Sequence, residues 1–99
     1  MAEQITALHI LVSTDGREPE AAKSQIEAIR DQIAGGADFA DIARAKSDCP
    51  SGGQGGDLGS FGRGAMVAEF EAAAFALDVD AVSGIVETDF GYHLILRTA

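Results

Sequence analysis

The sequence predicts an α+β fold, in which helices pack around a four-stranded, mainly antiparallel sheet. An apolar, β-branched run comes first, two segments with helical spacing follow it, and the chain closes with two short strand-like runs joined by a turn. The order strand, helix, helix, strand, helix, strand, strand mixes local and distant pairings, as α+β domains do. The 99 residues predict a single domain over 1–99.

The first half of the chain gives the clearest elements. Ile5–Val12 is almost continuously apolar, which predicts a buried strand that ends in the turn residues after it. A helix is expected to begin at Pro19, which suits a first helical position, and to stop at Gly35-Gly36. Asp38 can cap a second, short helix that ends near Lys46.

The second half begins with a segment rich in glycine. Seven glycines between Ser51 and Gly64 predict a loop without helix, interrupted by a short strand around Leu58–Phe61. Glu69–Leu77 returns to a helical pattern. Ile85–Glu87 and Tyr92–Leu96 predict two strands joined as a hairpin.

Composition excludes several classes of partner. Seven basic and sixteen acidic residues give a formal charge of -9, which repels nucleic acids and anionic membranes. The chain has no long apolar stretch and no leader-like start, so we expect a cytoplasmic protein, unless these residues were excised from a longer exported protein. We also expect the protein to be a monomer. Cys49 is the only cysteine, which excludes an internal disulfide and a multi-thiolate zinc site.

Three titratable side chains suit chemistry near neutral pH: Cys49 in a polar turn, and His9 and His93 on the first and last expected strands. If these strands are neighbours, the histidines can face each other across the ladder, where opposed Cβ atoms lie about 5 Å apart. The plainer alternative is that each histidine is a half-buried strand residue bonded to backbone, and that the cysteine is a loop residue without a function.

Other kinds of site would use the same residues. A Cys/His pair would suit a thiol hydrolase, but the local signatures of those enzymes are absent. A Cys/His/His zinc site would need closely spaced ligands, and here they lie 40 and 44 residues apart (49 − 9 and 93 − 49). The glycine-rich segment does not match a phosphate-binding loop, because Arg63 is its only basic residue.

Five segments, in this order, resemble parvulin-type peptidyl-prolyl cis/trans isomerases over nearly the whole chain. They are His9–Val12, Ser47–Gly52, Gly56–Phe61, Met66 with Phe70-Glu71, and Phe90–Ile95. The resemblance implies a four-stranded antiparallel sheet with surrounding helices and a groove that binds proline. It also implies that no metal or organic cofactor is needed.

The resemblance assigns roles to individual residues. It places His9 and His93 on the family's paired histidines, Cys49 on its active-site cysteine or aspartate, and Thr88 on a hydroxyl residue of the same network. The positions that line the proline pocket are Leu58, Met66 and Phe70. Phe90 departs from the serine of phosphate-directed members, which favours apolar substrates.

The expected function is cis/trans isomerisation of X-Pro bonds in flexible or unfolded polypeptides, without a phosphate requirement. The alternative is a peptide-binding chaperone module with little catalysis. Cys49 could act on the substrate carbonyl electrostatically, attack it, or only polarise the groove, and we favour the electrostatic role. Phosphate-directed parvulins carry a basic cluster after the first strand, where this chain has only Arg17 beside Asp15 and Glu18.

Overall fold

The predicted α+β fold is confirmed by a computed structural model, which describes residues 4–99. The elements are β1 (Gln4–Ser13), α1 (Pro19–Ala34), α2 (Phe39–Lys46), the 3-10 helix η1 (Pro50–Gln54), β2 (Asp57–Gly62), α3 (Ala68–Ala76), β3 (Val86–Thr88) and β4 (Gly91–Arg97). The strands form one sheet in the order β2-β1-β4-β3, and every neighbouring pair is antiparallel. Within this described part of the chain, no helix has the length and apolarity needed to cross a membrane.

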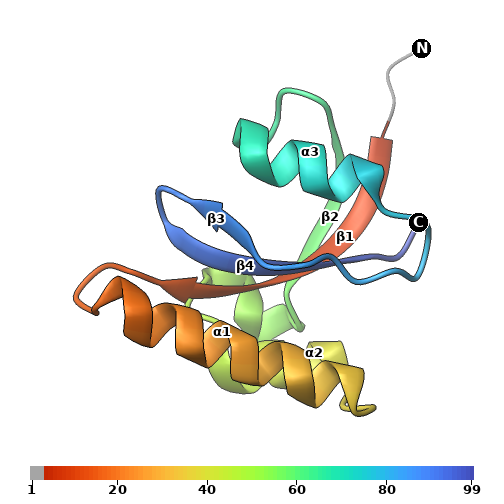
Figure 1. Cartoon of the computed structure of the whole chain (residues 1–99). Coiled ribbons are helices and arrows are strands. Elements are labelled where there is room, and N and C mark those ends of the chain that lie inside the picture. Colours follow the sequence, from red (N-terminus) through yellow and green to blue (C-terminus); the bar gives the residue numbers. More distant parts are fainter. Residues whose placement is uncertain (1–3) are drawn as a thin grey trace.

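Helices cover both faces of the sheet (Figure 1). Helices α1 and α2 pack on one face and α3 on the other. Because successive side chains of a strand point to opposite faces, β1 contributes to two cores. Ile10 and Val12 pack under α1 and α2, whereas Ile5 and Ala7 pack under α3. The α3 face also carries both histidines, and it is therefore the face of the candidate site.

The ends of the first two helices follow the sequence signals. Pro19 is the first residue of α1, and Gly36 follows the helix with a φ of 107°, a left-handed conformation that glycine adopts without strain. The Asp38 side chain accepts a hydrogen bond from the Asp41 amide at 3.2 Å and so caps α2. The expected start of α1, its end at Gly35-Gly36 and the cap of α2 are confirmed.

The prediction that the glycine-rich segment contains no helix is wrong at its start, where η1 forms. The Gly52 amide bonds to the Cys49 carbonyl at 2.8 Å, and the Gly55 amide bonds to the Gly52 carbonyl at 3.0 Å. Gly52 is buried against α2, where a Cβ would lie 3.0 Å from the Ala43 carbonyl oxygen. The glycine at position 52 therefore allows this segment to pack closely against α2, and one short 3-10 turn is compatible with that packing.

Candidate active site

A cavity of about 370 Å³ opens on the α3 face of the sheet. It is lined by His9, Leu11, Asp48, Cys49, Leu58, Met66, Phe70, Phe90 and His93. Seven of the eight side chains expected from the sequence are on this lining, and the eighth, Thr88, bonds to His93. The sequence reasoning missed Leu11 and Asp48. Strand alternation could have found Leu11, because it lies two residues after His9.

The two histidines meet between neighbouring strands, but not as a directly opposed pair. In the register of β1 and β4, His9 lies opposite Ile95 and Leu11 lies opposite His93, so the histidines are diagonal neighbours. Their rings nevertheless stack with centroids 5.5 Å apart and planes 19° apart. The two Nδ1 atoms are 3.3 Å apart, which is hydrogen-bonding distance. The expected pairing of side chains is present, and the expected register was wrong by two residues.

Burial sets the protonation state of this pair. Each histidine is only 5% exposed, and the Phe70 ring meets both imidazoles edge-on at centroid distances of 5.5 and 5.4 Å. Desolvation lowers the pKa of His9 to about 4, and desolvation together with repulsion from His9 lowers the pKa of His93 to about 4. Both imidazoles are therefore neutral at pH 7. The two histidines are buried rather than half-buried, and their rings meet each other.

Thr88 continues the hydrogen-bond network at the other side of His93. Its Oγ1 lies 2.7 Å from His93 Nε2 and accepts a hydrogen bond from the Phe90 amide at 3.2 Å. A hydroxyl that already accepts this bond can give its own hydrogen to Nε2. We assign the His93 proton to Nδ1 on this basis, so that it donates to His9 Nδ1.

Cys49 is positioned by a short segment that runs along the edge of β1. The Asp48 amide donates to the Leu11 carbonyl at 2.8 Å, and Asp48 Oδ2 accepts from the Ser13 amide at 2.9 Å. Ser47 Oγ accepts from the amides of Leu11, at 3.1 Å, and Cys49, at 3.4 Å. These bonds fix the half-buried Cys49 side chain at the cavity, in agreement with its expected accessibility.

The apolar wall of the cavity comes from four separate elements. Leu58 lies on β2, Met66 on the loop before α3, Phe70 on α3 and Phe90 on the β3–β4 turn. Phe70 is 3% exposed and packs on the ring of Phe61 with centroids 6.2 Å apart, so it belongs to the core as well as to the cavity. Phe90, in contrast, is 60% exposed. The wall therefore has a fixed base and an open rim.

The zinc alternative has no support in the geometry. Among residues 4–99, no group of three His, Cys, Asp or Glu side chains is placed to hold a metal ion. Cys49 and the two histidines line one cavity without forming such a group.

An antiparallel sheet of this order, with an apolar cavity above a buried histidine pair, is the arrangement expected of a parvulin. The chain belongs to that family: the rotamase model, described as a PPIC-type PPIase domain, matches residues 9–99. It is 44% identical to the peptidyl-prolyl cis-trans isomerase Pin1 of Arabidopsis thaliana, over 98% of this chain and 97% of the relative. It is also 46% identical to the chaperone SurA of Chromobacterium violaceum, over 97% of this chain but 23% of that protein.

Solved structures agree with the sequence comparisons. The peptidyl-prolyl isomerase ESS1 from Candida albicans superposes with a TM-score of 0.91 at 32% identity, over 97% of this chain and 63% of that one. TbPIN1 superposes with a TM-score of 0.89 at 36% identity, over 100% of both chains. The protein is thus a peptidyl-prolyl cis/trans isomerase that acts on proline-containing peptides.

Proposed function

We propose that the cavity on the α3 face binds the prolyl ring and accelerates rotation of the X-Pro bond without a covalent intermediate or a phosphate requirement. The observation that supports this most directly is the composition of the lining, which combines apolar side chains with two neutral imidazoles, Cys49 and Asp48.

The reaction needs a site of this kind because the barrier comes from amide resonance. Rotation of the peptide bond costs about 18–20 kcal/mol, and the twisted transition state loses the charge separation of the planar amide. A cavity that excludes water binds the twisted form better than the planar one, and this difference in binding lowers the barrier. Leu58, Met66 and Phe70 supply the apolar contacts around the pyrrolidine ring.

The polar residues would act by position and charge. Cys49 would face the carbonyl of the residue before proline and tune its polarity. An aspartate, which the resemblance allows at this position, could do the same and would be a poor nucleophile. The neutral histidines would hold β1 and β4 in register and orient the network through Thr88.

The charges near the cavity support the absence of a phosphate requirement. Arg17 forms an ion pair with Asp48 at 2.7 Å. The Arg63 guanidinium lies 4.4 Å from the centre of the Phe75 ring and 3.8 Å from a Glu71 carboxylate oxygen. Residues 65–96 contain six acidic residues and no lysine or arginine. A phosphorylated side chain adds about −1.5 to −2 charge, for which these surroundings offer little compensation.

Substrate choice tests this proposal. Exchange NMR at moderate salt would compare four otherwise identical peptides with Leu, Ser, phosphoserine or Glu before proline. We expect the leucine peptide to have the highest kcat/KM, and phosphoserine to be no better than serine. The glutamate peptide separates a general charge effect from phosphate recognition. A clear preference for phosphoserine over serine and glutamate would overturn the proposal.

A chaperone role is a second candidate, because the similar proteins include the chaperone SurA and the foldase PrsA. In the chaperone role, the protein would act as a monomeric domain whose apolar cavity holds exposed X-Pro segments of unfolded chains. A protein whose refolding is limited by prolyl isomerisation separates the two activities: catalysis speeds refolding at substoichiometric amounts, whereas holding alone slows it. Unchanged exchange of the free peptides at stoichiometric protein would leave only the chaperone role.

A further inference from the structure

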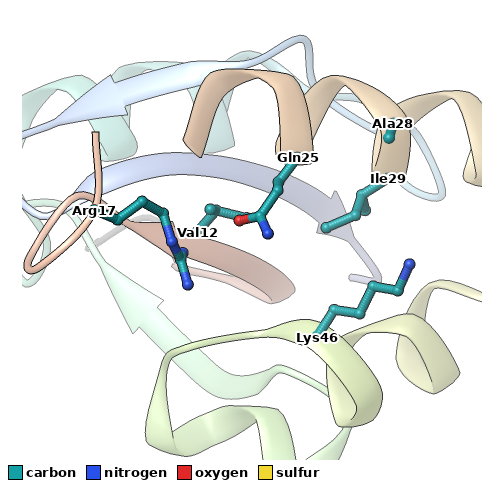
Figure 2. A pocket seen from close by; sticks show the side chains of 6 residues that line it. All are labelled: Val12, Arg17, Gln25, Ala28, Ile29 and Lys46. Atoms are coloured by element: carbon teal, nitrogen blue, oxygen red, sulfur yellow. The ribbon is translucent and has the colours of Figure 1, made fainter. Parts of the chain in front are cut away.

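A second cavity, of about 310 Å³, lies on the opposite face of the sheet from the candidate active site. It is lined by Val12, Arg17, Gln25, Ala28, Ile29 and Lys46. Figure 2 shows Arg17 and Lys46 reaching toward the space from opposite sides, while Gln25 and Ile29 descend from α1. Its volume is at the lower end of the range for small-molecule sites.

The charge of this cavity is opposite to that of the whole chain. Two of the seven basic residues line it, although the formal charge of the protein is -9. Among the residues that the structure places on its lining there is no Asp or Glu. Val12 and Ile29 supply apolar surface between the two cations, beside the Gln25 amide (Figure 2). An anion with a charge at each end and an apolar middle would match this pattern.

Both cations have donors available for such a ligand. Within residues 4–99, the Arg17 guanidinium bonds through Nη1 alone, to the Ser13 carbonyl at 3.1 Å and to Asp48 Oδ2 at 2.7 Å. Since a guanidinium carries five N–H donors, Nε and Nη2 remain for a carboxylate. Lys46 is exposed, and its contact with Gln32 Oε1 is long, at 3.5 Å. Its ammonium group can therefore turn toward a ligand at little cost.

We propose that this cavity binds a small aliphatic dicarboxylate. One carboxylate is held by Arg17, the other by Lys46, and the methylene chain lies over Val12 and Ile29. The Gln25 side-chain amide offers a further donor between them.

The proposed ligand would also affect the isomerase cavity through a shared ion pair. Arg17 lines the second cavity and Asp48 lines the first, and the two side chains are paired at 2.7 Å. A carboxylate on Arg17 competes with Asp48 for the same charge. Removing the Asp48 charge should therefore strengthen ligand binding.

Amide NMR titrations with succinate and glutarate at constant ionic strength test the proposal, with butyrate as the singly charged comparison. We expect saturable shifts at the lining residues. Arg17→Gln and Lys46→Gln should each weaken binding about tenfold, the equivalent of about 1.4 kcal/mol, and butyrate should also bind about tenfold more weakly. Lys23→Gln is the matched control, because it removes the same charge from an exposed site on α1 outside the lining, and it should change little.

A second pair of variants separates the ion-pair effect from net charge. Asp48→Asn should tighten dicarboxylate binding more than Asp15→Asn, which removes an exposed charge from the neighbouring turn. Thermal melts would identify any variant that loses its fold. If all three basic variants weaken binding equally, or butyrate binds as well as succinate, the association is general charge attraction and the proposal is wrong. The absence of saturable shifts in the wild-type protein would also overturn it.

Discussion

Acidification should destabilise this protein through its two buried histidines. The pKa of each is about 4 in the folded protein, whereas an unfolded histidine has a pKa near 6.5. Between these values the unfolded chain binds more protons than the folded one. The free energy of unfolding therefore rises with pH in this window, and stability present above pH 6.5 is lost as the pH falls toward 4.

The size of the effect follows from the same values. For one histidine whose pKa moves from 6.5 to about 4, the loss of stability at pH 5 relative to pH 8 is about 2 kcal/mol. Both histidines together give about 4 kcal/mol. A domain of this size is stable by about 5–15 kcal/mol, so the change is a large part of the total.

Two measurements check this prediction. Urea unfolding followed by circular dichroism at pH 8 and pH 5 gives the stability difference, and His9→Asn should reduce that difference to about half. Because the chain contains two histidines, their ring signals in NMR spectra can be followed individually from pH 8 to pH 5. Neither should titrate in this range. A ring signal with a midpoint near 6.5, or a stability difference that His9→Asn leaves unchanged, would refute the reasoning.

Two further predictions concern the cavity lining. Cys49→Ala should lower kcat/KM about tenfold or more, because a charged or hydrogen-bonding group at this place is worth about 1.5–3 kcal/mol. Cys49→Asp keeps such a group and should therefore retain more activity than Cys49→Ala. Equal activities of the two variants in the exchange assay would contradict an electrostatic role. Phe70→Ala should cost about 3–5 kcal/mol of stability because its ring is buried. Met66→Ala empties a half-buried position, so it should lower kcat/KM and cost less stability than Phe70→Ala. Urea unfolding beside the peptide assay compares the two, and equal losses of stability would place Met66 in the core.

Local sequence patterns predicted the elements well because local physics determines them. The apolar run of β1, the proline that begins α1 and the aspartate that caps α2 act within a few residues of their position. The final hairpin is similarly local, since β3 and β4 are joined by a short turn. These elements are present within one or two residues of the expected bounds.

Properties that depend on packing between distant segments could not be read from the sequence. The diagonal offset of His9 and His93 depends on the register of β1 against β4, which are separated by most of the chain. The burial of Phe70 depends on contacts with both histidines and with Phe61 from β2. An apolar residue next to a cavity has the same sequence signal whether it is a wall or a core residue. Asp48 was missed because its role rests on its contacts with β1 and Arg17.

The glycine-rich segment connects the fold to the site at one residue, Gly56. Its φ is 82°, and a Cβ there would lie 2.3 Å from the backbone oxygen of His9. The Gly56 carbonyl also accepts the His9 amide at 2.9 Å, so this contact holds β1 beside the histidine pair. Gly56→Ala should therefore cost at least about 2 kcal/mol, because it adds left-handed strain to a backbone collision.

Gly53→Ala provides a matched control three residues earlier, since a Cβ there meets nothing within 4 Å. Such an exposed substitution should change stability by no more than about 0.5 kcal/mol. Urea unfolding gives both values, and the His9 ring signal should shift in Gly56→Ala alone because its strand must move. If the two variants are equally stable, the close approach of Gly56 to β1 does not fix the position of His9, and the loop would tolerate a side chain at either place.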